Sequence, residues 1–179
     1  MSNAVPNPTH HFVPVLIGEG FEGSGASVAH VKLMIGDRYG PVGHAFATAL
    51  ATPTMGHEPF LVVARPGLPV KPFTLFVATA AIATQEHATL TWGAAQAGVA
   101  GGVVDAVAAG FVPADIAELA VVVASVWVDP SAGAAHQDAV YINNRAAMRT
   151  ALANASTSRP SVHEVMADES GVWNPFFTP

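Results

Sequence analysis

The segment 28–72 constrains the fold more than any other part of the chain. It begins with VAHVKLMI, in which apolar and polar positions alternate over most of the run. Side chains alternate between the two faces of a strand, so one face is expected to enter the core and the other to carry polar groups. The expected core face holds Ala29, Val31, Leu33 and Ile35, and the opposite face holds Val28, His30, Lys32 and Met34.

The other elements do not follow a strict strand-helix alternation. Strands are predicted at 12–17, 28–35, 60–64, 74–82 and 119–128, and helices at 41–50, 85–109 and 138–153, with a short helix after Asp115. The glycine-rich segment 18–25 is predicted to be a loop, because glycine weakens regular structure. Strands that come singly and in pairs between helices indicate a two-layer α+β sandwich.

Composition limits the class of protein. At 179 residues, with 51% hydrophobic and 11% charged residues, the chain is expected to form one domain with a full core. The net charge of −6 argues against a nucleic-acid partner. The absence of cysteine excludes disulfides, thiolate metal sites and a cysteine nucleophile.

The ends of the chain are expected to lie outside the domain. Residues 1–10 are predicted to be disordered or derived from a tag, 11–155 to form the domain, and 156–179 to form a tail. This tail is either flexible or an arm that docks on a neighbour. Without a signal sequence or a membrane-spanning apolar run, we expect a cytoplasmic protein with no membrane contact.

His30 is the first candidate for chemistry. A histidine suits a general acid because its ordinary pKa lies near neutrality, but the residues alone leave open a solvated histidine on an exposed sheet face. Gln96 is either a boundary polar residue of its helix or a ligand contact, and Leu61 either core or contact. No spacing of histidines and carboxylates is typical of zinc, so no metal is expected.

Three motifs carry a resemblance to a known family. They are VAH at 28–30, LPVKP at 68–72 and WGAAQ at 92–96. On these, the chain resembles the formaldehyde-activating enzymes over roughly 15–152. Those enzymes condense formaldehyde with the one-carbon carrier tetrahydromethanopterin, a reduced pterin.

The resemblance implies a fold, a reaction and a set of roles. The fold would be a mixed β-sheet covered by helices on one face. His30 would be the proton donor of a carbon–nitrogen lyase, and Leu61 and Gln96 would contact the substrate. The pterin would be a co-substrate with no permanent cofactor. The resemblance also implies a homo-oligomer, commonly a pentamer, with the site near a subunit boundary.

The substrate site departs from the family pattern. Lys32 stands where members carry an aspartate, and Thr79 and Ala81 stand where they carry a lysine and a threonine. An ammonium close to an imidazole disfavours the protonated ring. Lys32 is therefore either a solvated lysine or the site lysine relocated to another strand. The departures also leave open a binding or sensing protein that has lost turnover or changed its ligand.

Overall fold

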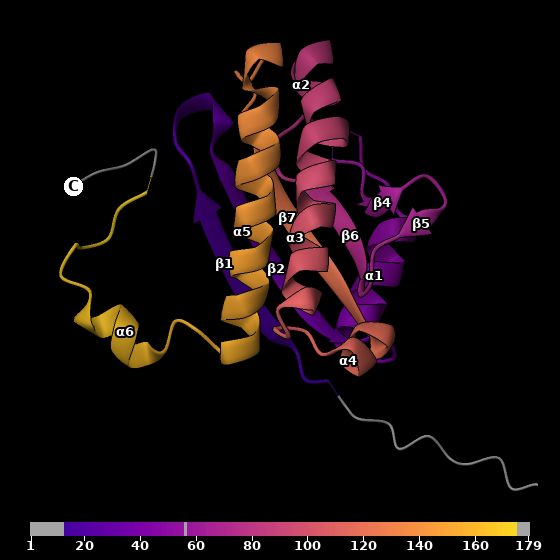
Figure 1. The fold of residues 1–179 in the computed structure, drawn as a ribbon, viewed down its shortest axis with the longest axis vertical. Helices are drawn as coiled ribbons and strands as arrows, with labels where there is room; N and C mark the ends of the chain where they lie inside the picture. Colours follow the sequence, from indigo (N-terminus) through magenta and orange to yellow (C-terminus); the bar gives the residue numbers. More distant parts are fainter. Residues whose placement is uncertain (1–12, 56, 175–179) are drawn as a thin grey trace, which may run out of the picture.

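The computed structural model describes residues 13–55 and 57–174, and its fold is built on a five-stranded mixed sheet (Figure 1). The strand order is β1-β2-β7-β6-β3, with β6 and β7 parallel and the other neighbours antiparallel. The strands are β1 (Leu16–Glu22), β2 (Ala29–Asp37), β3 (Phe60–Leu61), β6 (Phe73–Ala78) and β7 (Ala120–Val128). A small second sheet pairs β4 (Val63–Arg65) with β5 (Leu68–Pro69).

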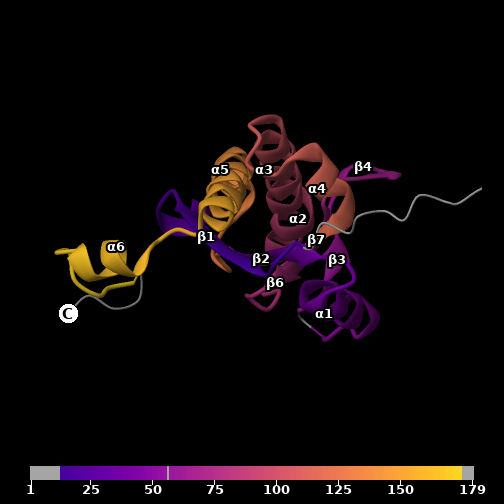
Figure 2. The same ribbon diagram turned by 90° about the horizontal axis from the view of Figure 1, so that it is seen from below.

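Two long helices form the second layer. α3 (Gln96–Ala108) and α5 (Gln137–Thr157) lie side by side over one face of the sheet, and α1 (Pro41–Ala51) lies against the other face at one end (Figure 2). The remaining helices are α2 (Gln85–Leu90), α4 (Ala114–Leu119) and α6 (Val162–Ala167), with short turns η1 (Gly25–Ser27), η2 (Thr91–Ala95) and η3 (Ala134–His136). The predicted α+β architecture is confirmed.

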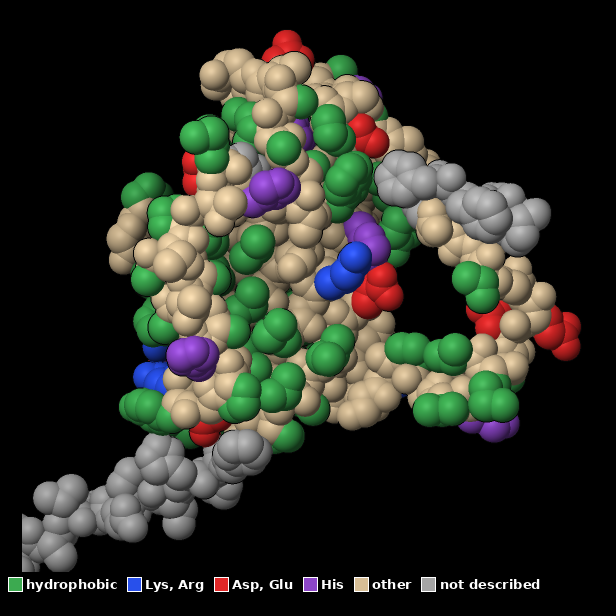
Figure 3. Space-filling view, turned by 180° about the vertical axis from the view of Figure 1, so that it is seen from behind, with side chains coloured by type: hydrophobic (Ala, Val, Ile, Leu, Met, Phe, Trp, Pro, Cys, Tyr) green, Lys and Arg blue, Asp and Glu red, His purple; other side chains and the backbone are tan. Residues whose placement is uncertain are grey.

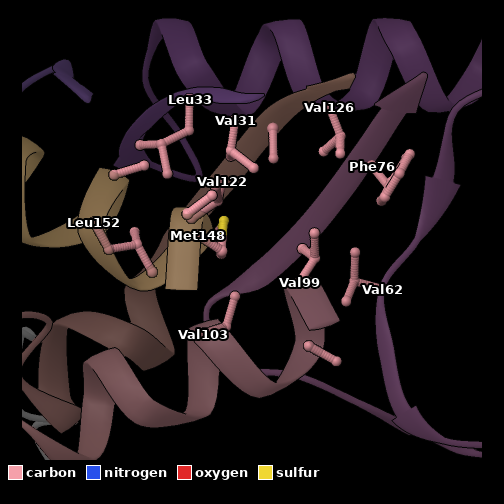
Figure 4. Close-up of a cluster of buried hydrophobic side chains, with 14 of the residues drawn as sticks. Val31, Leu33, Val62, Phe76, Val99, Val103, Val122, Val126, Met148 and Leu152 are labelled. Carbon is pink, nitrogen blue, oxygen red and sulfur yellow. The ribbon is translucent and has the colours of Figure 1, made fainter. Parts of the chain in front are cut away.

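The core lies between the sheet and the layer of α3 and α5 (Figure 4). The alternation in 28–35 gave the buried face correctly, since Val31 is 0% and Leu33 4% exposed. These side chains meet Val99 of α3 and Met148 of α5 in one cluster of buried residues. The opposite face of β2 therefore keeps its polar side chains outside the core.

The predicted loop at 18–25 is wrong over most of its length, because 18–22 belongs to β1. A Cβ on Gly18 would lie 2.0 Å from the carbonyl oxygen of Ala151, and one on Gly20 would lie 2.0 Å from that of Ala147. The glycines therefore allow the backbone of α5 to rest directly on β1. Their function is close approach between a strand and a helix, not freedom of the chain.

Other boundaries shift in ways that affect the site. The strand predicted at 74–82 ends at Ala78, and the long helix predicted at 85–109 contains one π-helical turn, η2. Trp92 lies in this turn and is 50% exposed. The predicted strand 60–64 divides into β3 and β4, which pair in different sheets.

The predicted ends of the domain are only partly covered by the structure. Residues 1–10, with their predicted disorder or tag origin, lie outside the described residues. α5 continues to Thr157, and the tail beyond it holds α6 and is described to Asn174. Within the described part of the chain, every helix is too short or too polar to cross a membrane.

Candidate active site

A cavity of about 870 Å³ opens on the sheet face that points away from α3 and α5. Its walls come from β2, β7, the β1–β2 connection, the end of β6 and the C-terminal segment. On this face, basic, acidic and histidine side chains lie together beside hydrophobic ones (Figure 3). The lining includes Phe21, His30, Lys32, Thr79, Ser125, Trp127, Asp129 and Trp173.

Strand register explains why these residues meet. His30 is paired with Phe21 on β1 and with Trp127 on β7. Lys32 is paired with Glu19 on β1 and with Ser125 on β7. Residues directly opposite in an antiparallel pair share a face. Three adjacent strands therefore deliver one mixed polar and aromatic surface.

The His30 ring is held by its neighbours on β1. Its Nε2 pairs with the Glu19 carboxylate, and the Phe21 ring meets it edge-on at 5.6 Å between centroids. The His30 side chain is 26% exposed, so the ring is mostly enclosed but still reachable. Within the described residues, no hydrogen bond is made by its Nδ1. The sequence did not reveal Glu19, because it lay in a segment predicted to be a loop.

Two of the three positions that differ from the family pattern line the same cavity as His30. Lys32 is exposed on β2, and Thr79 follows the end of β6. The Thr79 hydroxyl and backbone N–H both donate to the carbonyl of Val126 at 3.0 Å, so this side chain also fixes the local backbone. Ala81 is exposed beyond β6 and does not line this cavity.

Leu61 and Gln96 lie together elsewhere, in a pocket of about 440 Å³ that also contains Trp92. The Gln96 amide nitrogen donates to the carbonyl of Val63 at 3.0 Å. Its Oε1 is buried and has no hydrogen-bond donor among the described residues. This oxygen is therefore an acceptor that a ligand N–H could use.

The two groups do not meet within one chain. β7 and β6 separate the strand of His30 from β3, which carries Leu61. Gln96 lies on α3, whose layer covers the sheet face opposite to His30. Both groups were predicted as candidate site residues, and a single chain keeps them on different faces and near different edges of the sheet.

Other histidines have structural roles. His87 is 1% exposed, accepts a hydrogen bond at Nδ1 from the N–H of Ala83 at 3.2 Å, and lies 3.1 Å through Nε2 from the carbonyl of Val128. This pattern requires the neutral ring with its proton on Nε2. In residues 13–55 and 57–174, no three His, Asp or Glu side chains are grouped to hold a metal ion.

Comparisons with known proteins give the site a context. The sequence model of the family described as "Formaldehyde-activating enzyme (Fae)" matches residues 17–177, which extends well past the region 15–152 that carried the resemblance. A 5,6,7,8-tetrahydromethanopterin hydro-lyase of Methanosarcina barkeri is 38% identical over 172 residues, covering 96% of each chain.

Two longer relatives match over the same region. The bifunctional enzyme Fae/Hps of Methanococcoides burtonii is 41% identical over 155 residues, and that of Archaeoglobus fulgidus is 42% identical over 161 residues. These matches cover 87% and 90% of this chain. The matched region spans only 39% of either relative's length.

Proposed function

This chain belongs to the formaldehyde-activating enzyme family, and we propose that it condenses formaldehyde with tetrahydromethanopterin as a carbon–nitrogen hydro-lyase. Support comes from the relative named as a tetrahydromethanopterin hydro-lyase, which this chain matches over nearly its whole length. The enzyme names of the relatives favour catalysis over a binding or sensing protein without turnover. The cytoplasmic location, the lack of a bound cofactor and the lack of a nucleic-acid partner stay predictions.

The proposed reaction needs one proton donor and correct positioning. One amine of the carrier adds to the carbonyl carbon of formaldehyde and gives a carbinolamine. His30 protonates the hydroxyl, the C–O bond breaks, water leaves and an iminium forms. The second amine then attacks the iminium carbon and closes the methylene bridge. The second amine loses a proton in this step, and His30 takes it up and returns to its protonated form.

The observation that carries the proposal is the setting of His30. Its ring lines a cavity large enough for a substrate, and Glu19 holds Nε2. This arrangement leaves Nδ1 as the edge available to a bound adduct. Glu19 is a positioning residue in this scheme, because it acts through the imidazole and not on the substrate.

Lys32 supports the relocation of the site lysine. It lines the same cavity as Thr79, which stands where the family carries that lysine. Lys32→Ala is expected to weaken tetrahydromethanopterin binding. Lys71→Ala is the matched control, because Lys71 is the only other lysine of the sequence and does not line this cavity. Its Nζ pairs with the Glu118 carboxylate at a distance of 3.0 Å. Equal affinities for the two variants would contradict relocation.

We further propose that a complete site forms between subunits of a homo-oligomer. The His30 cavity of one subunit would face the pocket of Leu61 and Gln96 on the next. The separation of these groups within one chain and the unpartnered Gln96 Oε1 support this arrangement. The shared site is tested by exchanging subunits between the His30→Ala and Gln96→Ala proteins and measuring activity. Light scattering measures the size of the oligomer.

The mixed oligomers distinguish shared from separate sites. If each site uses His30 from one chain and Gln96 from its neighbour, some mixed sites contain both native residues and activity returns. If each chain builds its own site, no site regains both residues and the mixture stays inactive. The second result would remove the intersubunit arrangement but leave the reaction in place.

The function itself is tested by one assay. Purified protein is mixed with formaldehyde and tetrahydromethanopterin, and formation of the methylene adduct is followed above the spontaneous rate. His30→Ala should lose about 10²–10⁴-fold in rate, the usual contribution of a general acid. His44→Ala, an exposed change on α1, is the control. Binding of the pterin without any acceleration by the unaltered protein would refute the enzyme proposal.

A further inference from the structure

The C-terminal strap, residues 159–174, leaves the body of the protein and returns to it at the His30 cavity. The chain turns away after α5, where Ser158 adopts a left-handed φ of 52°. From 156 to 174, every residue except Glu164 is exposed. Open space separates the middle of the strap from the body in Figure 3. The strap therefore gains little stabilisation from packing along most of its length.

Local hydrogen bonds nevertheless give the strap a defined shape. Arg159 Nε donates to the Glu164 carboxylate at 2.9 Å, and the Ser161 hydroxyl accepts from the N–H of Glu164 at 3.2 Å. Further along, the N–H of Ser170 donates to the Asp168 carboxylate at 2.9 Å. These contacts cap α6 and order the turn after it.

The end of the strap meets the candidate active site. Trp173 and Asn174 line the same cavity as His30 and Lys32. Trp173 is 56% exposed, whereas its neighbour Val172 is 91% exposed, so the indole is partly covered where the strap reaches the cavity. Asn174 also forms a single backbone β-bridge. The strap thus begins at the end of α5 and meets the His30 cavity at Trp173 and Asn174.

We propose that the C-terminal strap is a lid over the His30 cavity and that Trp173 contacts the ligand bound there. Trp127 on β7 and Trp173 on the strap give the cavity two indoles from opposite parts of the chain. Such surfaces suit a flat, nitrogen-rich ring. That ring is the reduced pterin if the proposed function holds, and only this identification of the ligand depends on that function.

The lid has a physical advantage for the proposed chemistry. A closed cavity limits access of bulk water while the carbinolamine loses its hydroxyl, and it strengthens the electrostatic interactions inside. Within residues 159–174, the strap lines the cavity through Trp173 and Asn174, so within this range opening it moves one end of the strap and leaves the sheet and helices in place. A ligand can therefore enter without unfolding the domain.

Lid closure is tested without any ligand by cross-linking, since the native chain contains no cysteine. Ser24 and Asn174 both line the cavity, so Ser24→Cys/Asn174→Cys should be joined within one chain by a short bismaleimide. Ser24→Cys/Thr157→Cys is the control, because Thr157 lines a different pocket. Mass spectrometry on mixed isotope-labelled and unlabelled chains identifies the linked peptides. No link, or links only between chains, would overturn a lid formed by the chain's own strap.

Contact with the ligand is tested by Trp173→Ala against Val172→Ala, its exposed neighbour. Trp173→Ala should weaken tetrahydromethanopterin binding by about threefold to tenfold, the range typical of one aromatic contact. It should also speed modification of His30 by diethyl pyrocarbonate, with exposed His44 as the internal reference. Val172→Ala should change neither quantity, and equal behaviour of the two variants would overturn the proposal.

The two proposals fail in different ways. A protein that forms the within-chain cross-link and protects His30 through Trp173, but binds no tetrahydromethanopterin, would keep its lid and lose the proposed function. A protein that accelerates methylene-adduct formation but forms no such cross-link would keep the function and lose the lid.

Discussion

The close approach of β1 and α5 makes a sharp prediction at Gly20. In Gly20→Ala the new Cβ would lie 2.0 Å from the carbonyl oxygen of Ala147, whereas ordinary contact begins at 3.4 Å. The helix and strand must therefore separate by the difference, 1.4 Å, at this point. One colliding atom is the Cβ attached directly to the β1 backbone, and the other is a backbone oxygen of α5. A side-chain rotation therefore cannot relieve the overlap.

The cost follows from the size of that separation. A gap of about 0.5–1 Å already removes a quarter to a half of the dispersion energy of the atoms that face it. The α5 face that would lift away carries Ala147, Ala151 and Ala155, all buried against the core. Overpacking usually costs about 1–3 kcal/mol, and a backbone collision belongs at the upper end or above it. We expect Gly20→Ala to lower the free energy of unfolding by about 3 kcal/mol or more.

Gly93→Ala is the matched control, with an effect of opposite sign. Among the described residues, and apart from its chain neighbours and its own helix backbone, no atom lies within 4 Å of a Cβ built on Gly93. This glycine is exposed in a helical segment. Alanine there should stabilise the protein by about 0.5–1 kcal/mol. Urea unfolding followed by circular dichroism, at one fixed protein concentration, measures both variants. A loss below about 1 kcal/mol for Gly20→Ala would refute the close-approach argument.

Three further predictions concern the buried His87, Glu164 of the strap and the positioning residue Glu19. His87→Leu should leave the buried Val128 carbonyl without its His87 partner, at a cost of about 1–3 kcal/mol. The exposed change His44→Leu should stay within about 0.5 kcal/mol in the same urea assay. Arg159 and Ser161 hold the pKa of Glu164 at about 2, below its ordinary 4.5. The contribution of Glu164 to α6 is therefore complete above pH 4.5 and is lost as the pH falls towards about 2, which carboxyl NMR can follow. In the proposed scheme Glu19 positions His30 and makes no ligand contact, so Glu19→Gln should lower turnover with little change in tetrahydromethanopterin affinity. Equal losses in turnover and affinity would contradict this role.

Patterns set by one strand were predictable from the sequence. The alternation in 28–35 placed Val31 and Leu33 in the core, because period-two burial depends only on which face meets the helices. The same alternation put His30 and Lys32 on the outer face. Pro41 marked the start of α1 for a similarly local reason, since its ring favours the first helical turn.

Features that depend on a partner element were missed. The glycines of β1 resemble a loop in isolation, because their use becomes visible only when α5 rests on them. The pairing of Glu19 with His30 depends on the register between β1 and β2. Predicting each of these features requires knowing which element packs or pairs against the segment, and the local residues do not show this.

The charges around the His30 cavity suggest how the departures from the family pattern are compatible with the proposed reaction. Lys32 replaces the expected aspartate, but Glu19 supplies a carboxylate from the adjacent strand and Asp129 lines the cavity wall. When His30 is protonated, the positive charges of His30 and Lys32 balance the negative charges of Glu19 and Asp129. Once His30 has given its proton to the leaving hydroxyl, the surroundings carry one excess negative charge at the moment when the iminium cation forms. Opposite charges attract most strongly where water is scarce, so the proposed closure of the strap over this cavity would increase the stabilisation of the iminium by its surroundings.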